Sequence, residues 1–188
     1  MEVKETALKY EKKYTYADYE SWDDGNRYEL TDGKIHMMSP PSQKHQEISG
    51  ELFVQFHNFL RGKACKVLAA PFAVRLNADK EDDTIFEPDL LVVCDKSKLD
   101  GKRCNGAPDL VIEILSPSTA SRDRVTKFNK YLQAGVREYW IVDPESKTVS
   151  VHILENGKYV VQSYGDTGEI TVSVLEGCII SAEDVFAE

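Results

Sequence analysis

Long apolar runs and closely paired cysteines are both missing from this 188-residue sequence. No stretch of eighteen apolar residues occurs, so we expect no transmembrane span. The N-terminal residues MEVKETALKYEKKYTY lack the apolar centre of a signal peptide, which favours a cytoplasmic protein. The four cysteines form no CxxC pair and are expected to be reduced thiols, not a zinc site or a disulfide frame: Cys65, Cys94, Cys104 and Cys178.

Several common catalytic motifs are missing as well. The sequence contains no GxxxxGK[ST] phosphate loop, no GxSxG nucleophile turn, no HExxH zinc motif and no GxGxxG dinucleotide fingerprint. These absences remove the usual nucleotide-binding, serine-hydrolase and zinc-peptidase interpretations. The chemistry must therefore be sought in other polar residues.

Positive charge is scarce, with 23 Lys and Arg against 32 Asp and Glu and a formal net charge of −9. This balance argues against a protein that coats nucleic acid. It does not exclude a nuclease, because metal-binding carboxylates add negative charge. Two basic groups could attract phosphate locally, or could be ordinary solvated surface. The groups are Lys96, Lys98, Lys102 and Arg103 in one loop, and Arg122, Arg124, Lys127 and Lys130 in one predicted helix.

The pattern of apolar residues predicts one domain over residues 1–188, with residues 1–15 as a candidate flexible segment. Helices are expected at 16–23, at 43–61 after a Ser42 N-cap, and from Ser118 or Thr119 to Gln133 or Ala134, where Gly135 ends the helix. A hairpin is expected at 27–39 with its turn at Asp32-Gly33. Further strands are expected at 66–77, 85–94, 109–116, 138–144, 148–155, 158–165 and 169–175. The fold class is therefore α/β (α+β), a mixed sheet flanked by helices with additional antiparallel hairpins.

Glu113 is the residue that most needs an explanation, because it lies within the apolar strand PDLVIEILSPST (108–119). A buried carboxylate needs a partner, a metal ion or a raised pKa. With a period of two, Glu113 shares a strand face with Asp109, and Asp89 shares a face with Glu87 in FEPDLLVVC (86–94). If the two strands are neighbours, Asp89 and Glu113 converge, and two carboxylates with water suit Mg²⁺.

The helix that follows Glu113 supplies a third element. Asp123, Lys127 and Tyr131 are spaced i, i+4 and i+8, so they form one stripe. An adjacent apolar stripe is expected to hold the helix on the sheet: Val125, Phe128 and Leu132. Lys127 could then place its ammonium beside the two carboxylates and act on water or phosphate.

These features resemble the PD-(D/E)XK nuclease superfamily, which has a restriction-endonuclease-like fold. Pro88-Asp89 corresponds to the PD and Glu113 to the acidic residue that follows it. More closely, the chain is similar to the Uma-two family of restriction-endonuclease-like proteins. The segments that carry this similarity are YELTDGKI (28–35), MSPPSQKHQ (38–46), EPDLLVV (87–93), PDLVIEILSPST (108–119) and KFNKYLQAGVREYWIVDP (127–144). The lysine expected two residues after Glu113 is replaced by Leu115, and Lys127 on the following helix is the candidate substitute.

The resemblance implies a Mg²⁺- or Mn²⁺-dependent endonuclease that hydrolyses nucleic acid, with DNA as the expected substrate, acting as a homodimer. Asp89 and Glu113 would bind the metal, Lys127 would complete the catalytic set, and Tyr131 and Asp123 would orient Lys127. Three further residues are candidate supporting groups, each with an ordinary structural alternative: Glu29, His45 and Glu47. The alternative for the whole chain is an inactive nuclease-fold module in which Glu113 is ion-paired with Lys127.

Overall fold

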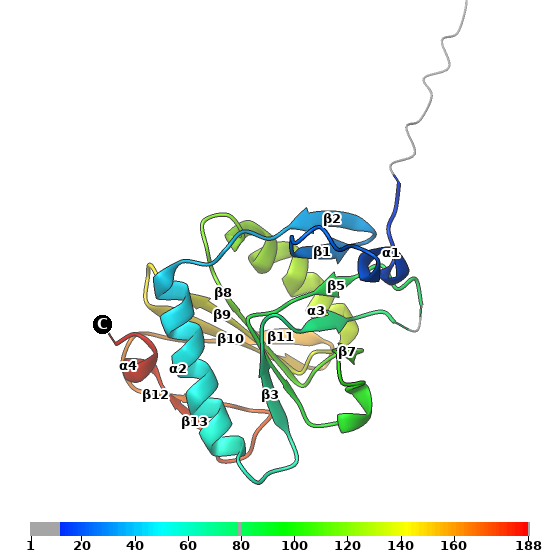
Figure 1. Ribbon diagram of the computed structural model, residues 1–188. Coiled ribbons are helices and arrows are strands. Elements are labelled where there is room, and N and C mark those ends of the chain that lie inside the picture. Colours follow the sequence, from blue (N-terminus) through cyan, green and yellow to red (C-terminus); the bar gives the residue numbers. More distant parts are fainter. Residues whose placement is uncertain (1–11, 79, 188) are drawn as a thin grey trace, which may run out of the picture.

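The computed structural model describes residues 12–78 and 80–187 (Figure 1). The chain begins with α1 (Tyr16–Glu20), the hairpin β1 (Tyr28–Thr31) and β2 (Lys34–Met37), and the long helix α2 (Gln43–Leu60). All three predictions for this region are confirmed. Asp32 and Gly33 both have positive φ values, as a two-residue hairpin turn requires, and Ser42 Oγ accepts a hydrogen bond from the His45 amide.

The central sheet has six strands in the order β11-β10-β9-β8-β6-β3. Its strands are β3 (Lys66–Ala69), β6 (Leu90–Val93), β8 (Leu110–Ile114), β9 (Glu138–Asp143), β10 (Thr148–Glu155) and β11 (Lys158–Tyr164). Only β8 and β9 run parallel, and the other neighbours are antiparallel. The mixed sheet flanked by helices that the sequence predicts is therefore confirmed.

A second sheet has the order β2-β1-β5-β4-β7 and adds β4 (Ala73–Arg75), β5 (Ile85–Phe86) and β7 (Arg103–Asn105). Two predicted strands, 66–77 and 85–94, are each divided between the two sheets. The divisions fall at Pro71 and at Pro88, and proline cannot donate to a strand ladder. The second division leaves Glu87 and Asp89 in the short passage between β5 and β6.

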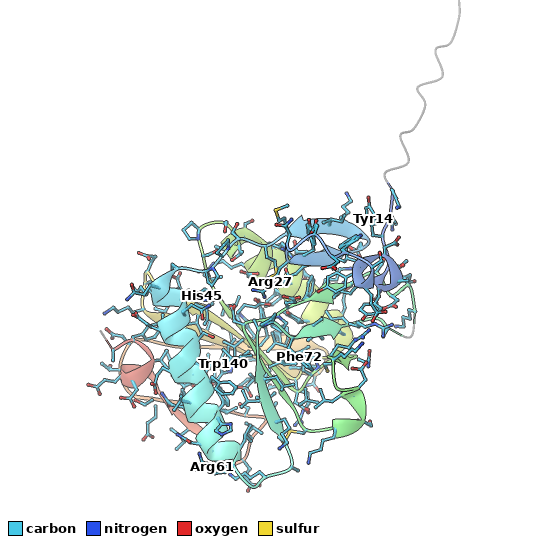
Figure 2. All side chains as sticks on the ribbon, in the orientation of Figure 1. Tyr14, Arg27, His45, Arg61, Phe72 and Trp140 are labelled. Atoms are coloured by element: carbon cyan, nitrogen blue, oxygen red, sulfur yellow. A yellow bond between two sulfur atoms is a disulfide. The ribbon has the colours of Figure 1, made fainter. Side chains whose placement is uncertain are left out.

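The central sheet separates two hydrophobic cores. On one face, α2 packs over Leu90, Ile112 and Trp140. Trp140 lies behind α2 in Figure 2, and its ring centroid is 5.7 Å from that of Phe56. On the other face, Leu91, Val111 and Leu115 pack with residues of β4, β5 and the helix α3 (Phe128–Ala134). The alternation predicted for both strands is thus confirmed.

Two predictions are wrong: that residues 169–175 extend the central sheet, and that Val125 lies on the buried face of the helix after β8. Residues 169–175 do not extend the central sheet, because β12 (Glu169–Thr171) pairs only with β13 (Ile179–Ser181), next to α4 (Ala182–Val185). The predicted helix after β8 is present and ends at Gly135, but Arg122–Lys127 form a π-helix, η2, before α3. Its wider turns leave Val125 exposed, with 59% of its surface accessible, so Val125 does not hold the helix on the sheet.

The prediction of four reduced thiols is also wrong, because Cys65 and Cys94 form a disulfide. Cys65 precedes β3 and Cys94 follows β6, and Lys66 pairs with Val93 in the ladder, so strand pairing brings the two cysteines together. Cys104 and Cys178 are free and buried. The disulfide removes the support that reduced cysteines gave to a cytoplasmic location.

Three remaining features complete the fold. A short 3₁₀ helix, η1 (Lys96–Lys98), lies in the basic loop. Of the candidate flexible segment 1–15, residues 1–11 lie outside the described residues, whereas the Tyr14 amide donates to the Gly33 carbonyl at 2.9 Å. Among the described helices, none combines the length and apolar character that crossing a membrane requires.

Candidate active site

A cavity of about 850 Å³ opens where the two sheets, the start of α2 and the π-helix meet. It is lined by Glu29 of β1, His45 of α2, Asp89, Glu113 of β8 and Lys127 of η2. Figure 2 places His45 at the first turn of α2 and Arg27 just before β1, and both residues line the cavity. Five segments that are distant in the sequence therefore contribute polar side chains to one concave site.

Glu113 lies at the buried end of this cavity, with 4% of its surface exposed. Its Oε1 accepts hydrogen bonds from Lys127 Nζ at 2.8 Å and from the Tyr131 hydroxyl at 2.7 Å. Burial raises the pKa of Glu113 well above its usual range although the Lys127 ammonium works to lower it, and the nearby Asp123, Asp89 and Glu29 raise this pKa further. Both hydrogen bonds that described residues make to Glu113 end on Oε1. Oε2 is the oxygen left for a ligand in the cavity.

Asp89 is held beside Glu113 by strand pairing. Leu90 pairs with Ile112 in the antiparallel β6–β8 ladder, which brings Asp89 level with Glu113. The Ile114 amide donates to Asp89 Oδ2 at 2.7 Å. His45 Nε2 lies 3.2 Å from the same oxygen. Burial works to lower the pKa of His45, but the hydrogen bond to Asp89 and the negative charges of Asp89 and Asp123 together raise that pKa.

Lys127 is the buried cation of the site, with 4% of its surface exposed. Its Nζ lies 2.8 Å from Glu113 Oε1, 3.0 Å from Glu29 Oε1 and 3.6 Å from Asp123 Oδ1. Burial would lower the pKa of Lys127, but the carboxylates of Glu113 and Glu29 outweigh it and raise the pKa. The amine is therefore an ammonium ion at neutral pH.

Glu29 connects the hairpin to the helix with both carboxylate oxygens. Oε1 accepts from the Glu87 amide at 2.8 Å and contacts Lys127, while Oε2 pairs with Arg122. Burial works to raise the pKa of Glu29, yet the two cations Lys127 and Arg122 lower it overall. Glu29 therefore remains ionised although only 1% of its surface is exposed.

The structure brings together seven of the eight residues that the sequence predicts for the site. Asp89, Glu113, Lys127, Asp123, Glu29 and His45 line the cavity, and Tyr131 reaches it through Glu113. Glu47 does not join them: it is exposed, accepts from Gln43 at 2.7 Å and does not line this cavity. Leu115, which occupies the position of the missing lysine, is 7% exposed and packs in the core.

Sequence reasoning missed the role of two residues at the site. The sequence places Arg122 only in a basic group that could attract phosphate or be solvated surface, whereas the structure shows it lining the cavity and paired with Glu29. Glu87 lies two residues before Asp89 in the passage between β5 and β6 and accepts from Arg27 and Tyr19. The strand period gave a signal for Glu87, whereas Arg122 is positioned by a π-helix that i, i+4 spacing does not predict. The basic loop at 96–103 does not line the cavity, and Lys98 Nζ donates instead to the Ala107 carbonyl.

The carboxylate oxygens at the cavity fit a magnesium or manganese ion that takes few of its ligands from the protein. Among residues 12–78 and 80–187, no group of three or more His, Cys, Asp and Glu side chains is arranged to hold a metal. Mg²⁺ usually binds proteins through one or two carboxylates and keeps several waters, so Asp89 and Glu113 would suffice. Asp123 Oδ1 is buried without a hydrogen bond, so an acceptor is left unsatisfied at the same cavity.

A mixed sheet with a PD-type aspartate, a strand glutamate and a lysine at one cavity defines the restriction-endonuclease-like class of nuclease folds. A family model described as "Putative restriction endonuclease" matches residues 16–183. The chain therefore belongs to the Uma2 family.

Two further proteins are similar to this chain over most of its length. The chain is similar to the uncharacterized protein slr1290 of Synechocystis, with 29% identity over 156 residues that cover 81% of this chain and 80% of that protein. A solved structure from Anabaena variabilis, described as a putative nuclease, matches with a TM-score of 0.74 and 20% identity. The match covers 92% of this chain and 97% of that one, so most of the fold is shared.

Proposed function

We propose that this protein is a metal-dependent endonuclease that hydrolyses phosphodiester bonds in DNA. The observation that carries the proposal is Glu113, which lines the cavity from a buried strand that also brings Asp89 alongside, with both of its hydrogen bonds from described residues on Oε1. A carboxylate with a raised pKa, paired carboxylates and an adjacent ammonium ion form a set that is typical of a catalytic site.

Each residue has a definite part in this proposal. Asp89 and Glu113 would hold Mg²⁺ or Mn²⁺, which when bound polarises a phosphate and lowers the pKa of water. Lys127 carries its proton at neutral pH, so its part is to stabilise negative charge that develops on the phosphate or to orient water, not to accept a proton. The Tyr131 hydroxyl holds Glu113 Oε1, and Asp123 lies 3.6 Å from the ammonium, so both restrict where Lys127 and Glu113 can point.

A second candidate function has one observation in its favour, namely that Glu113 and Lys127 do form an ion pair. In that case the protein would be a binding module without catalysis. A buried ion pair stabilises a fold little compared with apolar packing of the same volume. A structural pair also gives no reason for Asp89, Asp123 and Glu29 to surround the same cavity. The catalytic proposal accounts for the whole cluster, so it is preferred.

The proposal extends to assembly and substrate. Duplex cleavage requires a cut on each strand, and two copies of one site provide both cuts, so we propose a homodimer on DNA. Light scattering of the protein with and without a DNA duplex tests this part. A monomer in both conditions that still cuts both strands would contradict it.

The experiment that tests the function is a cleavage assay with supercoiled plasmid and with single-stranded DNA. Wild-type protein should cut in Mg²⁺ or Mn²⁺, and excess EDTA should abolish the cutting. Asp89→Asn should be inactive while retaining the wild-type melting temperature within a few degrees. Cleavage in EDTA, or full activity of Asp89→Asn, would refute the metal-dependent mechanism.

A further inference from the structure

Arg122 differs from two other arginines, Arg27 and Arg75, that pair with carboxylates beside the second sheet. Arg27 directs Nε and Nη2 at Glu87, and Arg75 directs the same two nitrogens at Asp82. Each therefore uses the side-on fork of the guanidinium fully. Arg122 gives only Nη2 to Glu29, and its Nε is buried without a hydrogen-bond partner.

Glu29 offers Arg122 only one of its two carboxylate oxygens. Glu29 Oε1 is already occupied by the Glu87 amide and by Lys127 Nζ, so only Oε2 remains for the guanidinium. A purely structural arginine would leave no buried donor unpaired, because such a group costs stability. Glu29 thus holds Arg122 in place and leaves hydrogen-bond donors unused.

The position of Arg122 makes these donors relevant to substrate. Arg122 lines the cavity beside Glu113 and Lys127, and it stands five residues before Lys127, one turn of the π-helix. Its side chain retains 19% exposure, and among the described residues Nη1 neither makes a hydrogen bond nor counts with the buried unpaired atoms. Arg122 Nη1 therefore offers N–H donors to a ligand in the cavity.

We propose that Arg122 is a phosphate-binding residue that holds a backbone phosphate of the nucleic-acid strand in the cavity, next to the carboxylate pair. The inference rests on the proposed function. An arginine suits this task because its planar fork matches two phosphate oxygens and its charge is permanent. Glu29 is then a positioning residue that aligns two cations, Arg122 for binding and Lys127 for chemistry, from one carboxylate.

The test is fluorescence anisotropy with a labelled single-stranded DNA oligonucleotide and its duplex, in EDTA and in Ca²⁺, over a range of salt. Arg122→Lys keeps a cation for Glu29 and removes the fork, so it is the principal variant. We expect it to weaken binding about tenfold, the scale of one lost charged hydrogen bond. Arg122→Ala should also reduce the salt slope of log Kd by about one. Arg137→Ala is the matched control, because Arg137 pairs with Asp109 and does not line the cavity.

A second measurement separates contact from a structural effect. Neutral methylphosphonate linkages, placed one at a time along the oligonucleotide, should weaken wild-type binding most at one position. Arg122→Lys should lose that positional effect and keep the others. Unchanged affinity and an unchanged positional pattern in the variant would overturn the inference, and so would the absence of any DNA binding by wild type. Wild-type binding without cleavage would instead refute the proposed function and leave the Arg122 contact to be decided by these data.

Discussion

Glu113 and Glu138 lie on the neighbouring parallel strands β8 and β9, and they are equally hidden, with 4% and 0% of their surfaces exposed. Burial is the main cause that raises the pKa of each. Their partners differ. Trp140 Nε1 donates to Glu138 Oε1 at 2.6 Å and the Val174 amide to Oε2 at 2.9 Å. Glu113 has a lysine and a tyrosine on one oxygen and a cavity at the other.

The difference shows how a functional carboxylate can be told from a structural one. Glu138 Oε1 is held by Trp140 of the same strand and Oε2 joins β9 to the segment before β13, so both oxygens are engaged by the fold. Glu113 has one carboxylate oxygen that accepts no hydrogen bond from the described residues, and further ionisable groups surround its side chain. Burial and a raised pKa do not distinguish the two glutamates, whereas the hydrogen-bond partners of each carboxylate oxygen do.

Glu113→Gln should produce the largest effect on activity. Glutamine keeps an acceptor for Lys127 and Tyr131 but cannot bind a metal as a carboxylate, so we expect cleavage to fall by roughly 10³-fold or more, equivalent to several kcal/mol of lost metal catalysis. The unfolding free energy should not decrease, because one of several neighbouring carboxylates is removed. Cleavage rates and urea denaturation of the same preparation measure both. Wild-type cleavage by this variant would contradict the account.

Lys127→Met should produce the largest effect on stability. It leaves Glu29 with less compensation in a buried site, and removing one member of a buried ion pair costs about 3–5 kcal/mol. The matched control is Lys130→Met, since Lys130 is on the next turn and pairs with Asp32 at the surface. That loss should be within about 1 kcal/mol. Similar losses of unfolding free energy in the two variants would show that the Lys127 ion pair contributes no more to stability than the surface pair of Lys130.

Glu138→Gln should lower stability and leave activity unchanged, which is the reverse of the result expected for Glu113→Gln. The amide group would present a donor where the fold supplies a donor, which leaves a buried group unsatisfied at a cost of about 1–3 kcal/mol. Cleavage per folded molecule should be unchanged, because Glu138 does not line the cavity. Reduced cleavage at a temperature where the variant is fully folded would contradict a purely structural role for Glu138.

The pH dependence of stability in EDTA should reveal Glu113 directly. Its pKa is raised in the folded state, so the protonated group adds stability below its ordinary pKa, and this contribution is lost as pH rises through the raised value. Wild type should therefore lose stability relative to Glu113→Gln as pH increases over that window. Saturating Mn²⁺ should remove the difference, since metal binding displaces the proton. A constant difference between the two proteins at every pH would contradict the raised pKa.

Val125→Thr should have the smallest effect and tests the π-helix. A continuous α-helix would bury Val125 with Phe128, whereas the π-helix exposes 59% of its surface. The expected change in unfolding free energy is within about 0.5 kcal/mol, as for other exposed positions. Phe128→Ala, which removes ring contacts with Tyr139 and Tyr159, is the positive control. A loss of unfolding free energy for Val125→Thr as large as that for Phe128→Ala would show that the protein in solution has a continuous α-helix here, with Val125 buried.

Much of this site could be predicted from sequence because it follows from strand periodicity. The period of two places Asp89 and Glu113 correctly, and the order of elements places Lys127 after Glu113. Features that depend on tertiary contacts could not be predicted in this way. Arg122 reaches Glu29 across 93 positions of sequence, and the disulfide arises because β3 and β6 pair. The π-helix has no spacing signature, which is why Val125 was assigned to the wrong face.

The most direct test of the central claim is calorimetric titration of Mn²⁺ into metal-free wild type, Glu113→Gln and Glu138→Gln, in two buffers of different ionisation enthalpy. The account predicts that wild type and Glu138→Gln bind Mn²⁺ alike and release a proton to the buffer. Glu113→Gln should bind at least tenfold more weakly, without the proton release. Equal Mn²⁺ affinity in wild type and Glu113→Gln, or no binding by wild type, would contradict a metal site at Glu113 and favour the ion-paired module.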